Sequence, residues 1–189
     1  MAEAARESDG TMAAILGLDD EVVEQLCAEI EGVWPANYNC PGQLVVSGET
    51  GAVDRLIEAA NENGARRTVK LPITGAFHSP LVASAADRLR PAVESLEWSD
   101  PAPPFMSTVT AHLEPAERLG QILLDKLTAP VKFTQAVAAL VAEGVDTFVE
   151  VGPGQVLSGL VRRCDRSVRT LSVGDAKGMA ELREVVSAV

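Results

Sequence analysis

The chain has 189 residues, of which 47% are hydrophobic and 23% are charged. This composition is typical of a folded globular protein and argues against intrinsic disorder, repeat arrays and disulfide-rich miniproteins. The longest apolar stretches, such as residues 136–142, are much shorter than the roughly 18 residues that a membrane span requires. The sequence therefore predicts no membrane association.

The charge is negative and unevenly distributed. The 27 acidic and 16 basic residues give a formal net charge of −11, and the whole excess lies in residues 1–65, which hold thirteen acids and two basic residues. The acidic total argues against nucleic-acid binding, because phosphate contacts require clustered Lys and Arg. We interpret the acidic third as a solvated face and expect any anionic ligand to bind the remainder.

The cysteines and histidines indicate neither a disulfide framework nor a zinc site. Cys27, Cys40 and Cys164 form no C-x-x-C pair and are odd in number, which favours reduced thiols. No Cys/His cluster suits zinc, so we predict no metal site. Residues 1–10 lack the apolar segment of a secretory signal, and a cytoplasmic location is expected.

Residues 11–72 alternate between strand-like and helical patterns. Apolar positions at helical spacing indicate two amphipathic helices, the first ending at Gly32 and the second at Gly64. The turn Cys40-Pro41-Gly42 is typical of a hairpin connection. Strands are expected at residues 12–18, 34–39, 43–47 and 67–71. The order β-α-β-β-α-β predicts a ferredoxin-like unit, with four strands and two helices on one face.

The pattern changes after a connector at residues 72–80, whose glycine and prolines disfavour regular hydrogen bonding. Helical patterns follow at residues 81–96, 116–127, 133–143 and 155–163, and after Asp175. Strands are expected at residues 105–111, 147–151 and 170–173, the second of them of the buried type. These strands are too few for a complete doubly wound sheet, so this region is interpreted as part of an α/β domain.

His78 is the first candidate for chemistry, because it lies in the connector between Phe77 and Ser79. A neutral imidazole there can take a proton from a hydroxyl or thiol near pH 7 and later return it. The structural alternative is a histidine that caps the following helix or satisfies backbone groups. His112 follows an expected strand among polar residues and is interpreted as an exposed side chain without a role.

Two further patterns each allow a functional and a structural interpretation. The glycine-rich run at residues 149–159 lies between a strand and a helix, where backbone N–H groups can hold an anion or simply form a tight turn. Four arginines can meet an acidic partner or form a solvated helix end: Arg162, Arg163, Arg166 and Arg169. The 189 residues contain no G-x-S-x-G nucleophile motif.

Three segments in order along the chain resemble the malonyl-CoA:acyl carrier protein transacylases. They are NYNCPGQLVVSG at residues 37–48, GAFHSP at residues 75–80 and EVGPGQVLSGL at residues 150–160. The opening GTMAAILGLD at residues 10–19 is similar as well. The resemblance implies a large α/β hydrolase-like domain that carries a ferredoxin-like insertion, with the active site in the cleft between them.

The same resemblance implies an activity and its residues. Family members transfer malonyl from malonyl-CoA, through a serine ester, to the phosphopantetheine thiol of acyl carrier protein in fatty-acid or polyketide synthesis, without a cofactor. By resemblance, His78 is the base that activates this serine and Asn39 is a polar residue of the cleft. Phe77 is similar to the bulky ring that excludes substrates with an α-methyl group.

The chain also departs from the family pattern. It contains no G-Q-G start, no G-H-S-x-G nucleophile and no arginine in the position that grips the malonyl carboxylate, and Lys126 stands where relatives commonly have glutamine. We therefore expect the chain to be the C-terminal part of a transacylase and to be catalytically incomplete by itself. Its expected partner is the missing N-terminal half. The alternative is a non-catalytic module that binds acyl carrier protein through the four arginines, or the complementing half of a split enzyme.

These expectations together predict three segments. Residues 1–10 are expected to form a leader or the remnant of a helix, residues 11–72 the ferredoxin-like subdomain, and residues 73–189 the C-terminal part of the large acyltransferase domain.

Overall fold

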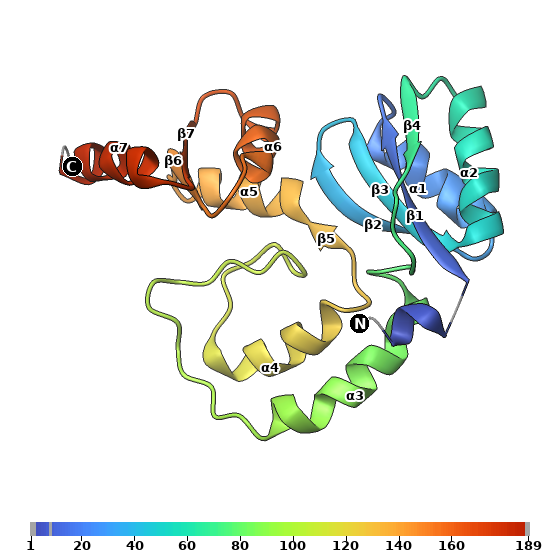
Figure 1. The fold of residues 1–189 in the computed structure, drawn as a ribbon, viewed down its shortest axis with the longest axis horizontal. Coiled ribbons are helices and arrows are strands. Elements are labelled where there is room, and N and C mark those ends of the chain that lie inside the picture. Colours follow the sequence, from blue (N-terminus) through green and yellow to red (C-terminus); the bar gives the residue numbers. More distant parts are fainter. Residues whose placement is uncertain (1–2, 8, 188–189) are drawn as a thin grey trace. The chain divides into compact units, whose positions relative to one another are not determined.

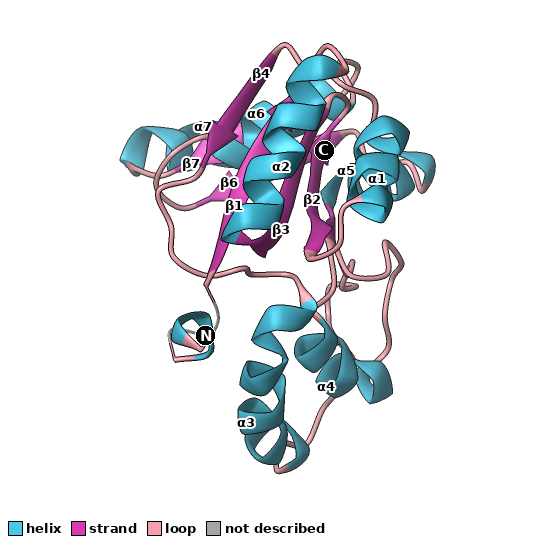
Figure 2. Cartoon of the chain, turned by 90° about the vertical axis from the view of Figure 1, so that its right-hand side faces the viewer, coloured by secondary structure: helices cyan, strands magenta, loops and turns pink. Residues whose placement is uncertain are grey.

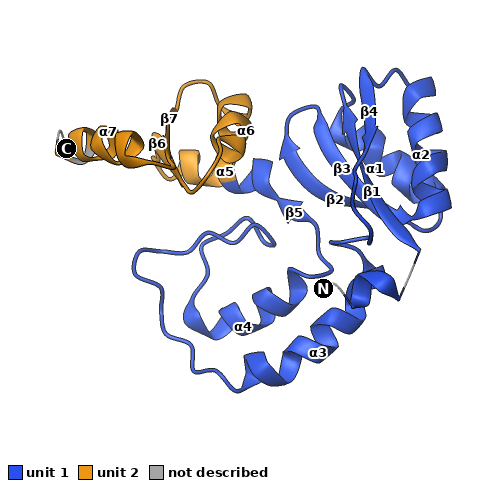
Figure 3. Ribbon diagram, viewed as in Figure 1, with its two compact units in different colours: residues 1–136 blue, residues 137–189 orange. Residues whose placement is uncertain are grey.

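The computed structural model describes residues 3–7 and 9–187. Their contacts divide the chain into two compact units, Met1–Ala136 and Val137–Val189 (Figure 3). The predicted boundary between residues 72 and 73 falls inside the first unit and stays a prediction. Part of the predicted leader, at residues 1, 2 and 8, and the last two residues of the third predicted segment lie outside the described residues.

The first unit is built on an antiparallel sheet with two helices (Figure 1). The strands lie in the order β4-β1-β3-β2, which confirms the predicted ferredoxin-like unit. Its elements in chain order are β1 (Gly10–Leu16), α1 (Asp20–Glu29), β2 (Val33–Cys40), β3 (Gln43–Glu49), α2 (Thr50–Glu62) and β4 (Arg67–Lys70). The predicted helices and strands of this part are each present, with bounds shifted by one to three residues.

Local sequence explains where these elements begin and end. Asp20 and Glu21 occupy the first turn of α1, where carboxylates interact favourably with the positive end of the helix dipole. Gly32, with φ of +92°, turns the chain into β2. Gly42, with φ of +70°, closes the hairpin in which Cys40 pairs with Gln43. The hairpin turn thereby sets the register of β2 against β3.

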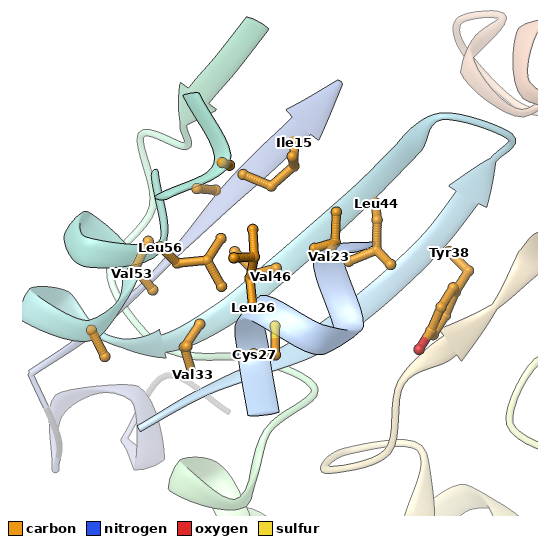
Figure 4. Close-up of a cluster of buried hydrophobic side chains, with 13 residues drawn as sticks. Ile15, Val23, Leu26, Cys27, Val33, Tyr38, Leu44, Val46, Val53 and Leu56 are labelled. Carbon is orange, nitrogen blue, oxygen red and sulfur yellow. The ribbon is translucent and has the colours of Figure 1, made fainter. Parts of the chain in front are cut away.

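The sheet buries side chains on both faces, because successive residues of a strand point in opposite directions. One face of β1 presents Ala13 and Ile15 to helices α1 and α2, which lie together on that side (Figure 2). The same cluster contains Val23, Leu26, Val46, Val53 and Leu56 (Figure 4). The other face carries a second cluster of Met12, Ala14, Ala36 and Val45. Burial on both faces accounts for the nearly continuous apolar runs of β1 and β3.

The remainder of the first unit is mostly helical. It contains two short 3₁₀ helices, η1 (Ala4–Arg6) and η2 (Pro80–Val82), then α3 (Ala83–Glu94) and α4 (Ala116–Asp125). Arg88 of α3 forms ion pairs with Glu3 and Glu7, which fastens the first described residues to this helix. The two-residue strand β5 (Val131–Lys132) pairs parallel with β2 and leads into α5 (Phe133–Ala142). No pattern predicted β5, since two residues are too few to show a period.

The predicted strand at residues 105–111 is wrong. The segment forms a turn closed by an isolated bridge between Met106 and Leu113, and Ala111 has a left-handed φ of +60°. The Ser107 hydroxyl accepts the Val109 N–H, and the Thr110 hydroxyl accepts the His112 N–H. Hydroxyl side chains that bond to nearby backbone groups compete with a strand ladder, and here this local bonding prevails.

The second unit contains a two-stranded parallel sheet. Strand β6 (Thr147–Val151) pairs with β7 (Arg169–Val173), α6 (Val156–Cys164) connects them, and α7 (Ala176–Ser187) follows. The elements were predicted, but the buried character of β6 was wrong, because the Val151 side chain is 76% exposed. Parallel strands are apolar because both faces are normally covered, and the described residues of this unit cover β6 incompletely.

No helix in the described ranges combines the length and the apolar character needed to cross a membrane.

Candidate active site

The loop at residues 75–79 presents His78 from the edge of the ferredoxin-like sheet. Gly75, with φ of +116°, donates its N–H to the Gly10 carbonyl of β1 at 2.8 Å. The fully buried Ser79 hydroxyl donates to the Ala76 carbonyl at 2.6 Å and accepts the Leu81 N–H. Between these anchors His78 adopts a left-handed φ of +59°, which is strained for a residue with a side chain. The loop thus holds one histidine in a conformation that the surrounding contacts impose.

The His78 ring is oriented by the end of α4. Its Nδ1 lies 3.0 Å from the Lys126 carbonyl oxygen, and its backbone N–H donates to the Leu127 carbonyl at 3.2 Å. A carbonyl oxygen only accepts hydrogen bonds, so Nδ1 carries the hydrogen and Nε2 of the neutral ring keeps its lone pair. The arrangement leaves Nε2 as the atom that can take a proton from a substrate or a nucleophile.

The surroundings of the ring keep it neutral near pH 7. Burial of the half-buried imidazole lowers the pKa of His78 below the ordinary value of 6.5. The hydrogen bond to the Lys126 carbonyl and an interaction with the Ala129 backbone oppose this shift, and the positive charge of Lys126 adds to it. Because the unfolded chain binds this proton more readily, the shift also removes stability as the pH falls below 6.5.

We expect the titration of His78, followed by NMR of the imidazole signals, to have its midpoint below pH 6.5. The chain has two histidines, so the spectra of His78→Gln and His112→Gln variants assign each signal. A midpoint for His78 above 6.5 would contradict the burial and the charge environment described for this ring.

The structure places the other two predicted residues in different settings. Asn39 is half-buried at the end of β2, where the register between β2 and β3 shifts between Tyr38 and Cys40. Phe77 packs on the second face of the sheet and also against the cluster of Ala4, Val82 and Ala85. The Phe77 ring therefore joins two hydrophobic clusters, and its position supports the loop that carries His78.

The connection between α4 and β5 was missed as part of the site. Lys126 supplies the carbonyl that orients His78, and its ammonium group donates to the Thr108 hydroxyl at 3.0 Å. The Thr108 carbonyl accepts the Lys132 N–H at 2.7 Å, and Lys132 pairs with Tyr38 of β2. The sequence indicated only that lysine is an unusual residue type at position 126. It could not indicate the contact with His78, because that contact is made by the backbone carbonyl of Lys126.

Comparison with known proteins places this geometry in a family. The sequence profile of the acyl transferase domain family matches residues 1–183. The chain belongs to the acyl transferase domain family. It is 42% identical to a malonyl CoA-acyl carrier protein transacylase of Bacillus subtilis, over 93% of this chain and 57% of the relative. A transacylase of the same name from Staphylococcus aureus is 37% identical, over 96% of this chain and 61% of the relative.

Solved structures of acyl transferases share the fold. The malonyl-CoA:acyl carrier protein transacylase of Xanthomonas oryzae superposes with a TM-score of 0.91 at 37% identity, over 97% of this chain and 60% of the other. The acyl carrier protein S-malonyltransferase of Vibrio cholerae gives a TM-score of 0.93 at 33% identity, over 96% and 61%. The chain thus spans about three fifths of the length of these relatives.

The glycine-rich run of this acyl transferase chain forms a turn that leads into α6. The Glu150 carboxylate already binds the N–H groups at the start of this helix. Gly152 and Gly154 have φ of +138° and +94°. The Glu150 carboxylate accepts the N–H groups of Leu157 and Ser158 at 3.1 and 2.8 Å, and these bonds lower the pKa of Glu150. A carboxylate on these donors repels a second anion, so the geometry favours the structural interpretation of the run.

The four arginines of the second unit are exposed: Arg162 and Arg163 lie at the end of α6, Arg166 in the loop beyond it, and Arg169 at the start of β7. Arg162 donates from Nε to the Thr170 hydroxyl of β7. Among the residues that the structure describes, no group of three or more His, Cys, Asp or Glu side chains could hold a metal ion.

Proposed function

We propose that this chain supplies the general base of a malonyl transferase, which moves malonyl from malonyl-CoA to the phosphopantetheine thiol of acyl carrier protein. The observation that carries the proposal is the Nδ1 contact of His78 with the Lys126 carbonyl, because it leaves the lone pair of the neutral ring on Nε2, where it can accept a proton. The printed names of the relatives, all malonyl transacylases, support the substrates. We place the reaction in the cytoplasm, in fatty-acid or polyketide biosynthesis.

In this mechanism Nε2 takes the hydroxyl proton of a serine as the serine oxygen attacks the thioester carbonyl of malonyl-CoA. The carbon–sulfur bond then breaks, and the imidazolium returns the proton to the coenzyme A thiolate. In the second half-reaction the same nitrogen removes the proton of the carrier-protein thiol, and the thiolate attacks the carbonyl carbon of the serine ester. The bond between this carbon and the serine oxygen then breaks, and the imidazolium returns the proton to the serine oxygen. The Lys126 carbonyl stabilises the transient imidazolium, in the manner of the carboxylate of a Ser-His-Asp triad.

The serine belongs to a G-H-S-x-G motif that these 189 residues do not contain. The proposal therefore assigns the nucleophile and the malonate-binding arginine to the part of the acyl transferase domain that this chain does not match. Asn39, at the end of β2, is assigned to the lining of the cleft. Phe77 is assigned a role in excluding larger acyl groups, supported by its fixed packing against the two clusters.

The test is a fusion of this chain to the preceding part of the Bacillus subtilis transacylase that it does not match. We expect the fusion to transfer malonyl from malonyl-CoA to acyl carrier protein, measured by the mass of the carrier protein. The 189-residue chain alone should gain no malonyl adduct. A folded fusion without transfer, or a stable malonyl ester on the isolated chain, would overturn the assignment.

The second candidate is a non-catalytic module that binds acyl carrier protein. The exposure of Arg162, Arg163, Arg166 and Arg169 favours it, since four cations on a chain of net charge −11 form a local positive surface for an acidic partner. The two candidates predict different results. If the chain is a binding module, the isolated chain binds carrier protein and the fusion transfers no malonyl. If the chain supplies the general base, the fusion transfers malonyl.

A further inference from the structure

Lys126 makes two contacts, one with His78 and one with Thr108. Its backbone carbonyl accepts the His78 Nδ1–H at 3.0 Å, and its ammonium group donates to the Thr108 hydroxyl at 3.0 Å. The next residue, Leu127, accepts the backbone N–H of His78. The side chain and the main chain of one lysine therefore connect the imidazole to the turn at residues 107–111.

The turn that receives the ammonium group is itself anchored. Thr108 accepts the Lys132 N–H through its carbonyl at 2.7 Å, and Lys132 belongs to β5, which pairs with β2. The carboxylate of the buried Glu114 accepts a hydrogen bond from the Thr110 hydroxyl at 2.5 Å. It also forms an ion pair with Arg118 at 3.1 Å. A hydrogen bond to Thr108 thus ties Lys126 to a part of the fold that is held by the sheet and by a buried carboxylate.

We propose that the Lys126 side chain is a positioning group for His78: its bond to Thr108 fixes the carbonyl that accepts the Nδ1–H, and so holds the ring with Nε2 free. The role of Nε2 in catalysis rests on the proposed function. The orientation of the ring does not, because it can be measured in the isolated chain.

A lysine suits this role better than a neutral side chain. Lys126 lines an apolar groove together with Trp98, Phe105 and Leu123. The desolvation that results lowers the pKa of Lys126. Within the described residues, Lys126 is the charged side chain that acts on the imidazole, and its positive charge disfavours the imidazolium form.

The test compares four variants of the isolated chain by the ¹⁵N chemical shifts of the His78 ring, which report the tautomer, and by its titration midpoint. Lys126→Met and Thr108→Val each remove the side-chain bond. We expect the ratio of the Nδ1–H to the Nε2–H form to fall by about threefold or more in both, the loss that one hydrogen bond of ordinary strength implies. Lys126→Met, which also removes the charge, should raise the midpoint.

Two conservative variants serve as matched controls. Lys126→Arg keeps a positive donor and Thr108→Ser keeps the hydroxyl, so both should retain the wild-type tautomer ratio. The urea midpoint of each variant separates a local change from loss of the fold. Wild-type shifts in Lys126→Met, or equal changes in Thr108→Val and Thr108→Ser, would overturn the positioning role. A fusion that transfers no malonyl, with the expected shifts intact, would refute the proposed function alone.

Discussion

In the active fusion, His78→Gln is expected to lower the rate of malonyl transfer by about 10²–10⁴-fold, the range that a positioned general base contributes. Glutamine keeps an N–H that can donate to the Lys126 carbonyl, but it offers no basic nitrogen in place of Nε2. The serine would then lose its proton acceptor in both half-reactions. The measurement is the initial rate of malonyl-carrier-protein formation at saturating malonyl-CoA.

His112→Gln is the matched control, because His112 is exposed and lies in the turn that the bridge between Met106 and Leu113 closes. This variant should transfer malonyl at the parental rate. A His78→Gln fusion that kept more than a tenth of the parental rate would rule out His78 as the base. Equal losses in both variants would instead indicate damage to the fold, which circular dichroism of the two proteins would reveal.

The ferredoxin-like unit was predictable from the sequence because each of its strands and helices carries its own period. Ala13 and Ile15 alternate with Met12 and Ala14, and both sets are buried, on opposite faces. The turn residues Gly32 and Gly42 have the positive φ angles that their positions suggest. Where local propensity and packing agree in this way, sequence patterns are reliable.

Propensity failed where side chains bond to their own backbone. Thr108, Val109 and Thr110 have high strand propensity, but the hydroxyls of Ser107 and Thr110 hold the segment in a turn. The burial predicted for β6 failed for another reason: its valines are apolar, but Val151 is exposed in this chain. The apolar pattern of a strand does not show which faces of the strand are covered, and the described residues cover β6 incompletely.

In the candidate site, too, some features were predictable from the sequence and others were not. His78 stood out because a titratable residue in a Gly/Pro connector is unusual, and Asn39 and Phe77 came from the family resemblance alone. The contact that gives His78 its tautomer comes from one backbone carbonyl, that of Lys126, 48 residues away in sequence. No residue type encodes a carbonyl position, so sequence reasoning had no means to find the role of Lys126 or Thr108.

Gly48→Ala is expected to destabilise the first unit by about 3 kcal/mol or more, at the upper end of the cost of overpacking. Gly48 lies on β3 between two strands, opposite Thr11 of β1 and Val33 of β2. A Cβ atom here would lie 2.2 Å from the Gly32 carbonyl oxygen and 2.7 Å from the Val33 Cα. Both are backbone atoms, so no rotation of a side chain relieves the overlap.

The surrounding bonds prevent the backbone from yielding. The Gly32 carbonyl accepts the Glu49 N–H at 2.9 Å, and Val33 is 2% exposed within the main hydrophobic cluster. Gly51→Ala is the matched control, because its Cβ would meet only the flexible end of Arg55, at 3.8 Å. Alanine in this helical position should stabilise the chain by about 0.5–1 kcal/mol. Urea unfolding followed by circular dichroism measures both changes.

The comparison of the two glycines also bears on function. Gly48 fixes the distance between β2 and β3 at one end of the hairpin, and Asn39 lies near the other end. If Gly48→Ala were as stable as the parent chain, β2 would not approach β3 as described, and the described position of Asn39 on β2 would lose its support. A large loss in Gly48→Ala with a gain in Gly51→Ala would instead mean that the backbones of β2 and β3 are in close contact at the end of the hairpin opposite Asn39.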